Sequence, residues 1–538
     1  MANARLTLME KVIPSHESSK ISSLVTKRIN SINYFPDELL LKILSYFTAE
    51  ELCLVIAEVC ERWNALAKDV ILWENLTYTC KREPTFTSVV KVLKRAPNLR
   101  SFVIMYRKDA VQLLELLFGN CVGIKRLEIN HCNLGNDCMD VLHKIMAFCP
   151  VLEELVLVGD YVPSTSARST ISQHRKRSRF NLTHCKVLKR PPNLKSLEIK
   201  ERDDAVQLLE HLFDKCNGIK RLEIKFCNLE DNIMHRLDKI VAFYPELEEL
   251  GLIGCEELTS TTASNIGQLR ELSKLNFSHC RDLKRNCLKK AIENGSKLKE
   301  LYLERFVRLL DDDLIHVISK VGAQLTTLKL YGNELTDDSF CYLEHCTRLQ
   351  VLDVSNCTLM TDKGLLEGIG ALQELRSLSL HETCYLTSPA WSTFLDRPAM
   401  ARLIYLKLNE CPKIDDYGLE GIANRCVHLK TLSLGRCYEV TDAGIMKIIC
   451  NCKKLQILDL ERVLRITGTG YLDLVPTHLP LLKRLNLSEC NLIPEELLLE
   501  LVAAMPQLEV RNRHGLVPSQ KIEDFSFWIH WKNCYFEN

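Results

Sequence analysis

The side chains of this chain best suited to chemistry are 24 cysteines and 15 histidines, spread over 538 residues. A thiol becomes a nucleophile or a metal ligand when its surroundings favour the thiolate. No Cys-x-x-Cys pair occurs, which argues against zinc ribbons and thioredoxin-like redox motifs. The Walker-type Gly-x-x-x-x-Gly-Lys-Ser/Thr, His-Glu-x-x-His and Gly-x-Ser-x-Gly motifs do not occur either. We therefore expect no catalytic residue, no metal site and no cofactor.

Eight of the 24 cysteines recur at one position of a repeated pattern, where packing already explains them. We interpret these as free thiols that act as small hydrophobic groups. Three histidines, His131, His279 and His381, fall at the ends of expected strands and are interpreted as ordinary polar positions. The recurring cysteines are Cys132, Cys227, Cys255, Cys280, Cys357, Cys411, Cys437 and Cys490.

Charge and hydropathy narrow the classes of partner. The 70 basic and 69 acidic residues give a net charge of +1, which provides no electrostatic case for nucleic acid or a membrane surface. The N-terminus lacks the basic-then-apolar pattern of a secretion signal, and residues 1–33 are polar and predicted to be a flexible leader. We expect no nucleic-acid or membrane partner and a cytoplasmic or nuclear location.

A repeat organises most of the chain. From Leu99 onward the pattern Leu-x-x-Leu-x-Leu returns every 24 to 28 residues with one exception. This predicts leucine-rich repeats over residues 90–510, an α/β solenoid of about 16 parallel strands on the concave face with helices outside. Thr or Asp oxygens are predicted to cap the helices. The capping pairs are Thr336-Asp337, Thr361-Asp362, Asp415-Asp416 and Thr441-Asp442.

Part of the array is duplicated. Residues 92–157 and 187–252 align without a gap at an offset of 95, with 42 identities in 66 positions. Cys138 of the first copy corresponds to Ile233 of the second, and Cys149 corresponds to Tyr244. These cysteines are therefore interpreted as replaceable packing groups.

Two segments depart from the repeat. Residues 160–186 form a polar and basic insertion, predicted either as a solvated surface loop or as a nuclear-import or phosphorylation-regulated segment. Residues 511–538 are rich in aromatic side chains and are predicted either to cap the open end of the array or to enter its concave face. Cys534 stands fifth from the end, which does not fit a Cys-a-a-X prenylation box.

The concave face is the predicted binding surface of the array, because residues that alternate with the inward leucines point to it. The tyrosines of this face are expected to cluster over neighbouring repeats, either as anchors for a partner or simply as strand formers. The predicted substrate-binding residues are Tyr302, Lys329, Tyr331, Asp353, Tyr405 and Lys407.

Before the repeats lies a short helical segment. Pro36 suits the start of a helix, followed by apolar residues at helical spacing. Thr48 and Glu51 read as a capping box that opens a second helix, on which Leu52, Ile56, Val59, Trp63 and Leu66 line one face. Such a small module cannot bury all its apolar surface alone, so part of it must meet the next domain or a partner.

The order of Phe35-Pro36, Leu39-Leu40-x-x-Ile43-Leu44, Val59-Cys60-x-x-Trp63 and Leu72-Trp73 resembles an F-box over residues 34–80. With the repeats, the chain resembles the F-box/LRR-repeat proteins. Phe35 and Glu61 depart from the usual Leu and basic residue of that pattern. The resemblance implies that the F-box binds Skp1 through Phe35, Pro36, Leu39, Leu40, Ile43, Leu44, Val59, Cys60 and Trp63.

The same resemblance implies a non-catalytic substrate receptor of a Skp1-cullin-F-box (SCF) ubiquitin ligase, linked through Skp1 to a cullin-RING assembly. The repeats would hold a protein substrate for ubiquitination and proteasomal degradation. The alternative is an adaptor-independent scaffold or inhibitor, in which the N-terminal helices only cap the array.

Overall fold

The computed structural model describes residues 35–516 except 82–84, 133–143, 146, 160–193, 202–217, 228–243, 255–259, 281–284, 307–308, 331–333 and 513–514, although Val141, Leu209 and Cys216 within those gaps are described. The chain divides into two compact units, Met1–Gly251 and Leu252–Asn538. The leader, the basic insertion and the aromatic C-terminal segment predicted from the sequence lie outside the described residues, apart from 511–512 and 515–516.

The first unit begins with a set of short helices. They are α3 (Asp37–Leu44), α4 (Ala49–Leu54), the 3-10 turn η1 (Ile56–Glu58), α5 (Glu61–Leu66) and α6 (Val70–Trp73). Thr48 and Glu51 form the predicted capping box at the start of α4. The single second helix expected after it is wrong, because α4 ends at Leu54 and the backbone is extended at Cys60 (φ −164°) before α5 begins. Three short segments stand in its place.

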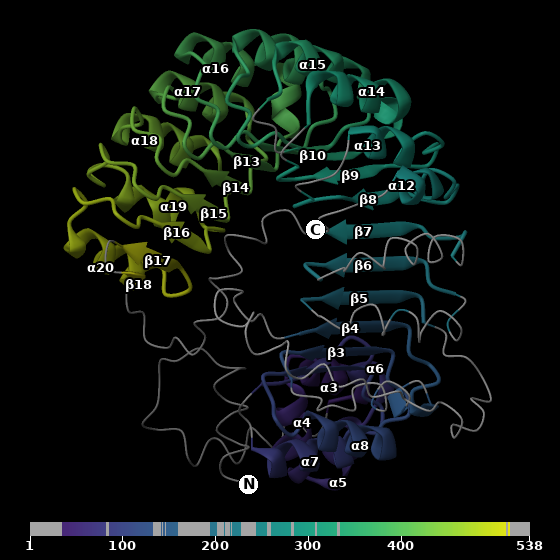
Figure 1. Cartoon of the computed structure of the whole chain (residues 1–538). Helices are drawn as coiled ribbons and strands as arrows, with labels where there is room; N and C mark the ends of the chain where they lie inside the picture. Colours follow the sequence, from purple (N-terminus) through teal and green to yellow (C-terminus); the bar gives the residue numbers. More distant parts are fainter. Residues whose placement is uncertain are drawn as a thin grey trace, which may run out of the picture. The chain divides into compact units, whose positions relative to one another are not determined.

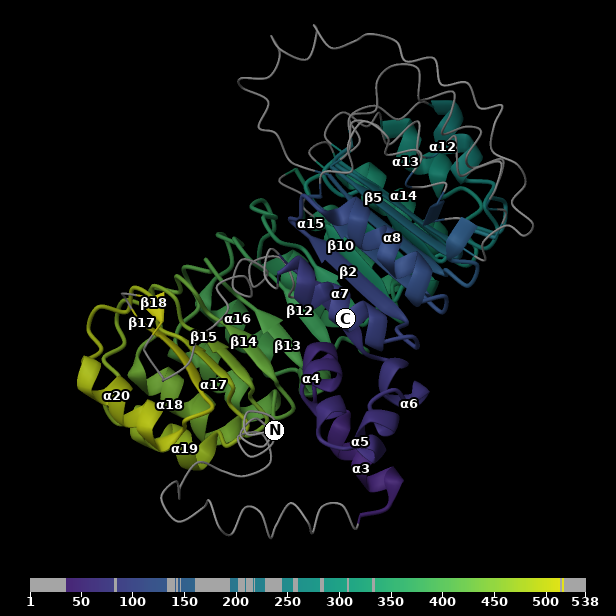
Figure 2. The same ribbon diagram turned by 90° about the horizontal axis from the view of Figure 1, so that it is seen from below.

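These helices are joined to the repeats within the first unit. Helix α4 packs against α7 (Phe86–Arg95), and Figure 2 shows α4 between α7 and the other short helices. Arg95 of α7 donates hydrogen bonds to the Cys53 carbonyl (3.0 Å) and to Glu58 (2.5 Å). Strand β1 (Thr77–Cys80) pairs in parallel with β2 (Ser101–Met105). The sheet therefore starts inside residues predicted to belong to the helical module.

The parallel ladder of the first unit runs in sequence order from β1 to β6, with helix α8 (Ala110–Asn120) packed on α7. Its later strands are β3 (Arg126–Asn130), β4 (Glu154–Val158), β5 (Ser196–Lys200) and β6 (Arg221–Lys225), and β7 (Glu249–Ile253) spans the boundary between the units.

The second unit repeats one strand and one helical segment (Figure 1). Its strands lie on the inner side of a curved layer and its helices α12 to α18 lie outside. The parallel strands are β8 (Lys274–Asn276), β9 (Glu300–Leu303), β10 (Thr327–Leu330), β11 (Val351–Asp353), β12 (Ser377–Ser379), β13 (Tyr405–Lys407), β14 (Thr431–Ser433), β15 (Ile457–Asp459), β16 (Arg484–Asn486) and β17 (Glu509–Asn512). Strand β18 (Gly515–Leu516) pairs antiparallel with β17.

The helices of the second unit are short, as expected for a returning segment of about ten residues. They are α12 (Ser260–Ile266), α13 (Arg285–Ala291), α14 (Asp311–Val321), α15 (Asp337–Cys341), α16 (Ser388–Leu395), α17 (Asp416–Arg425), α18 (Asp442–Asn451), α19 (Val475–His478) and α20 (Glu495–Ala504). A π-helical turn, Gly364–Gly368, takes the helix position in one repeat.

The predicted α/β leucine-rich-repeat architecture is confirmed. The central leucines of the strands, such as Leu352, Leu406 and Leu432, are buried. Recurring cysteines pack at the turn after the strand and donate to a backbone carbonyl of the preceding repeat. Examples are Cys411 to Leu380 O (3.2 Å) and Cys437 to Leu408 O (3.0 Å). Burial raises the pKa of Cys411 to about 12, which opposes thiolate chemistry.

The Thr and Asp residues at the helix starts do more than cap. Thr336 caps α15 as predicted by accepting from Asp338 N. Asp337, the next residue, reaches the following repeat, where Thr361 N (2.8 Å) and Thr361 Oγ1 (2.5 Å) donate to it. Equivalent links join Asp311 to Thr336, Asp362 to Thr387, Asp416 to Thr441 and Asp442 to Thr467. These hydrogen bonds tie neighbouring helices together in register.

Candidate protein-interaction sites

Helix α3 has one face inside the module and one face outside. Leu40 and Leu44 are almost fully buried, as is Trp63 of α5. On the outer side Leu39 is 49% exposed and Phe35 is 39% exposed. Burial of the first three holds the helices together, whereas the exposed pair leaves a large part of its apolar surface in water. Exposed apolar side chains grouped in this way are typical of a surface that meets a partner.

The start of α3 is fixed by a residue that the sequence pattern did not single out. Arg62 of α5 donates to the Phe35 carbonyl (2.7 Å) and to Asp37 Oδ1 (2.5 Å). Both contacts join segments 25 to 27 residues apart in the chain. Neighbouring Glu61 lies in the first turn of α5, where an acidic side chain suits the helix dipole. The charged side chains of Arg62 and Glu61 therefore stabilise the starts of α3 and α5.

Three further apolar side chains lie exposed on or beside these helices. Tyr46, two residues after the end of α3, is 75% exposed. Ile71 and Val70 on α6 are also exposed, and α6 packs against α3. Together with Phe35 and Leu39 they define the α3/α6 surface. Sequence reasoning missed these three because no helical periodicity distinguishes an outer apolar residue from a core one.

The nine residues predicted to bind Skp1 therefore divide into two groups. Leu40, Leu44 and Trp63 are buried, so in this structure they support the helices and do not offer a contact surface. The residues open to contact, fully or in part, are Phe35, Pro36, Leu39, Ile43, Val59 and Cys60.

This segment matches a known protein family. Residues 32–79 match the F-box-like family model. The segment is an F-box-like domain. The crystal structure of the Rad7 and Elc1 complex in yeast contains a chain that is 17% identical to this one. The alignment covers 92% of this chain and 98% of that chain, with a TM-score of 0.47. Thr77–Thr79 of strand β1, which opens the sheet of the first unit, lie within the matched residues.

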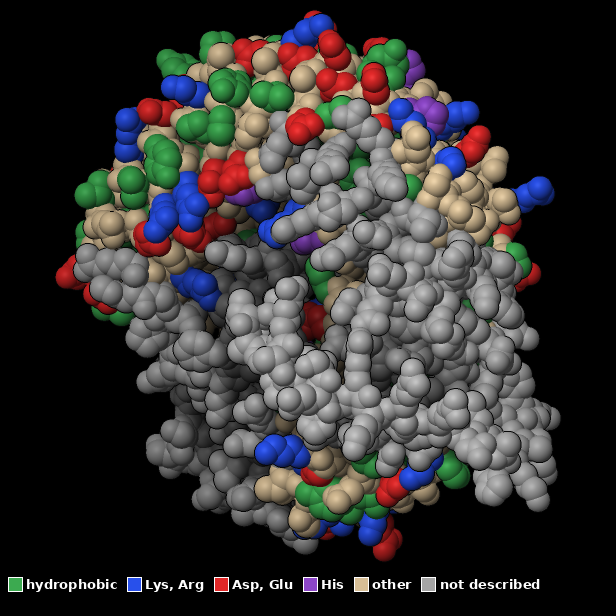
Figure 3. All heavy atoms as spheres, in the orientation of Figure 1, with side chains coloured by type: hydrophobic (Ala, Val, Ile, Leu, Met, Phe, Trp, Pro, Cys, Tyr) green, Lys and Arg blue, Asp and Glu red, His purple; other side chains and the backbone are tan. Residues whose placement is uncertain are grey.

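The second candidate site is the concave row of the second unit. Backbone register aligns Tyr302, Lys329, Asp353, Ser379 and Lys407 across strands β9 to β13. Four of these were predicted as substrate-binding residues, and they do lie in one row. Figure 3 shows interspersed acidic and basic side chains on the coloured part of this view of the molecule.

The predicted tyrosine cluster is wrong for Tyr302 and Tyr405. Tyr405 pairs with Ser377, so it belongs to a different row from Tyr302. Four strand steps separate β9 from β13, which corresponds to about 19 Å at the usual strand spacing. Tyr331 lies outside the described residues. The prediction failed because Tyr302 and Tyr405 belong to repeats that are four strand steps apart.

Tyr302 is engaged in contacts within the chain. The Lys274 and Lys329 ammonium groups lie 5.3 and 5.1 Å from its ring centroid, and its hydroxyl donates to Glu300 (2.9 Å). Lys329, itself buried, also approaches Glu304 at 3.9 Å. Burial raises the pKa of Glu304, and the nearby Lys329 charge works in the opposite direction. This end of the row is a preformed charged cluster.

The other end of the row is a buried hydrogen-bonded network. Asp459 accepts from Ser433 Oγ (2.7 Å) and Asn486 Nδ2 (2.8 Å), and all three side chains are almost fully buried. Burial raises the pKa of the Asp459 carboxyl, and these hydrogen bonds favour its charged form. The network fixes the concave surface of β14 to β16 in one arrangement. Sequence reasoning placed these residues on the concave face but did not predict their mutual contacts.

Two other properties bear on function. Within the described parts of the chain, no helix combines the length and apolar character needed to cross a membrane. The described residues contain one His and Glu group with metal-ligand proximity, His381, Glu382 and Glu410.

Proposed function

We propose that this chain is a substrate-recognition subunit of an SCF ubiquitin ligase, which binds Skp1 through its F-box-like domain. The observation that carries the proposal is the α3/α6 surface of that domain. Five exposed apolar side chains lie on or beside helices whose own core is already filled by Leu40, Leu44 and Trp63. An adaptor that covers this surface would remove it from water and gain the hydrophobic free energy that the isolated chain forgoes.

In this proposal the chain contributes position and not chemistry. Skp1 would connect it to a cullin-RING assembly, and the concave row would hold a protein substrate near the ubiquitin-conjugating enzyme. Holding two reactants together raises their effective concentration without a nucleophile on this chain. The described cysteines with resolved shifts have raised pKa values, in keeping with a non-catalytic subunit. Such a receptor would act in the cytoplasm or the nucleus.

The fixed charges of the concave row favour a substrate segment of mixed charge. Lys329 and Asp353 are buried and held in place, whereas Lys407 is only partly covered. We expect Lys407→Glu to weaken substrate capture without affecting Skp1, because the two surfaces lie in separate units. Proximity labelling in cells, with the proteasome inhibited, would identify the proteins whose capture this substitution reduces.

A co-purification experiment tests the adaptor step. Full-length chain is expressed with Skp1, and the doubly substituted Phe35→Asp, Leu39→Asp chain is compared with Leu499→Asp on α20, an exposed leucine (52%) outside the F-box-like domain. The proposal expects Skp1 to accompany the wild type and Leu499→Asp but not the double variant. Equal capture by all three chains would contradict it.

One observation favours the second candidate function, an adaptor-independent scaffold. The F-box-like domain contributes β1 to the sheet and packs α4 on α7, as a cap of the array would. A cap needs no adaptor. Absence of Skp1 from the purified wild-type chain, with substrate capture intact, would establish this alternative.

A further inference from the structure

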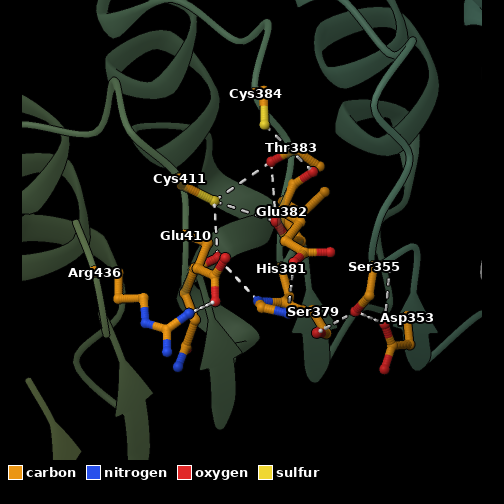
Figure 4. A network of polar contacts seen from close by, with 12 residues as sticks. Asp353, Ser355, Ser379, His381, Glu382, Thr383, Cys384, Glu410, Cys411 and Arg436 are labelled. Atoms are coloured by element: carbon orange, nitrogen blue, oxygen red, sulfur yellow. Dashed lines mark hydrogen bonds and ion pairs between the residues drawn. The ribbon is translucent and has the colours of Figure 1, made fainter. Parts of the chain in front are cut away.

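Three metal-ligand side chains meet where strands β12 and β13 end. Figure 4 shows His381 and Glu382 facing Glu410 of the next repeat. One ligand atom from each of the three lies within 4.8 Å of the others, and His381 Nε2 is 3.8 Å from Glu382 Oε1. We propose that these three side chains bind a divalent transition-metal ion such as Mn²⁺ or Zn²⁺. One imidazole nitrogen and two carboxylate oxygens are ligands that both ions accept.

The imidazole is oriented for coordination by its other nitrogen. His381 Nδ1 lies 3.2 Å from the Asn409 carbonyl oxygen. A carbonyl oxygen only accepts hydrogen bonds, so Nδ1 carries the proton and Nε2 of the neutral ring keeps its lone pair. A backbone carbonyl that fixes the tautomer in this way is a common feature of metal-binding histidines. The free lone pair lies on the side of Glu382.

The backbone holds both glutamates in fixed positions. Glu382 (φ 59°) and Glu410 (φ 56°) adopt left-handed geometry at equivalent places in successive repeats. Glu382 N donates to Asn409 O (3.1 Å) and Glu410 N donates to Gly435 O (2.8 Å). These hydrogen bonds between repeats set the spacing of the two carboxylates. The backbone under the site therefore needs little rearrangement when an ion binds.

Charge pairing along this edge leaves one carboxylate without a cationic residue beside it. Glu410 pairs with Arg436 of the next repeat at 2.6 Å. At equivalent positions further along the edge, Arg462 pairs with Glu489. Among described residues, the one basic side chain paired with Glu382 is His381, which carries no charge as the neutral ring described above. A bound cation would supply the missing positive charge, and Arg436 would orient one oxygen of Glu410.

The side chains have the freedom that coordination requires. Ligand atoms on one ion lie roughly 3 to 3.5 Å apart at bond lengths near 2.1 Å. The three side chains are 27%, 36% and 31% exposed, so small rotations can close the remaining distance. Three protein ligands leave at least one coordination position open. A water molecule or a carboxylate of a partner protein could occupy it.

Titration of the full-length chain with MnCl₂, followed by electron paramagnetic resonance of free Mn²⁺, tests the site. Mn²⁺ prefers oxygen and nitrogen ligands, which limits interference from the many thiols. We expect one tight site in the wild type and at least ~10-fold weaker binding in His381→Ala and in Glu382→Gln. ZnCl₂ should displace the bound Mn²⁺.

Glu489→Gln is the matched control. Glu489 has the same left-handed backbone geometry (φ 60°) as Glu382 and Glu410, and it pairs with an arginine as Glu410 does. It follows Ser488, however, whereas Glu382 follows a histidine. It should bind Mn²⁺ as the wild type does, and circular dichroism should show all the variants folded. The proposal is overturned if the wild type binds no Mn²⁺, if His381→Ala and Glu382→Gln bind it normally, or if Glu489→Gln weakens binding equally.

Discussion

The F-box-like helices and the strands of the repeats place their apolar side chains differently. Leu39 on α3, Tyr46 just beyond α3 and Ile71 on α6 are exposed around a filled core. On β8 to β16 the central leucines are buried, and the concave row consists mainly of polar side chains such as Asp353 and Asp459. The comparison teaches that the two regions suit different partners. The helices offer a hydrophobic contact, whereas the strands offer fixed charges and hydrogen-bonding groups.

The largest expected effect comes from breaking the core of the F-box-like domain. Trp63 is buried, so Trp63→Ala should destabilise this domain by ~3–5 kcal/mol. Leu39→Ala, on the outer face of the same module, should change stability by no more than ~0.5 kcal/mol. Urea unfolding followed by circular dichroism measures both. Equal losses would show that the division between core and α3/α6 surface is wrong.

In the repeats, the largest loss of stability is expected when the hydrogen-bonded link between neighbouring helices is removed. Asp337→Ala removes acceptors for Thr361 N and Oγ1 and for Gly364 N, which should cost ~1–3 kcal/mol. Asp338→Ala is the control, because Asp338 is exposed in the same first turn and experiences the same helix dipole. We expect it to change stability by less than ~0.5 kcal/mol. If urea unfolding shows similar losses of stability for both variants, the helix dipole and not the hydrogen bonds to the next repeat would be the cause.

Buried thiols should make the repeats sensitive to alkaline pH. The pKa of Cys411 is raised from 9.0 to about 12 by burial, so the folded state keeps a proton that the unfolded state loses. Its contribution to stability is therefore present below pH 9 and is lost as pH rises toward 12. Cys411→Ala should reduce the fall in stability between pH 8.5 and 10 measured by urea unfolding. An unchanged pH dependence would contradict this assignment.

The smallest effect concerns the exposed thiol. Among the described free cysteines Cys384 alone is classed as exposed, so iodoacetamide should label it before the buried thiols. This preference would reflect access and not catalysis. Cys384→Ser should remove the early label, seen by peptide mass spectrometry, and leave Skp1 capture unchanged. Loss of capture would give this thiol a role that the structure does not predict.

Sequence patterns predicted the features that repeat. The spacing of leucines located the strands, and Thr48 with Glu51 located the start of α4, because these signals act between residues close in the chain. The break after Val55 was missed, because apolar periodicity continues through the non-helical turn. Strand β1 was missed because Thr77–Cys80 precedes the first clear leucine frame.

Contacts across repeats were the least predictable. The link from Asp337 to Thr361 joins residues 24 apart, and the group of His381 and Glu410 joins neighbouring strands. No local spacing encodes which side chains face one another across a sheet. The same limit explains Tyr302 and Tyr405, which share a face but lie in different rows. Register must be known before side chains of different repeats can be grouped.

The measurement that tests the central claim most directly is the affinity of purified full-length chain for purified Skp1 by isothermal titration calorimetry. The account predicts a one-to-one complex that Leu39→Asp weakens by at least ~30-fold, the loss typical of a central interface residue, without lowering the unfolding midpoint. Leu499→Asp should bind as the wild type does. The account is contradicted if the wild type does not bind Skp1 at micromolar concentrations, or if Leu39→Asp binds with unchanged affinity.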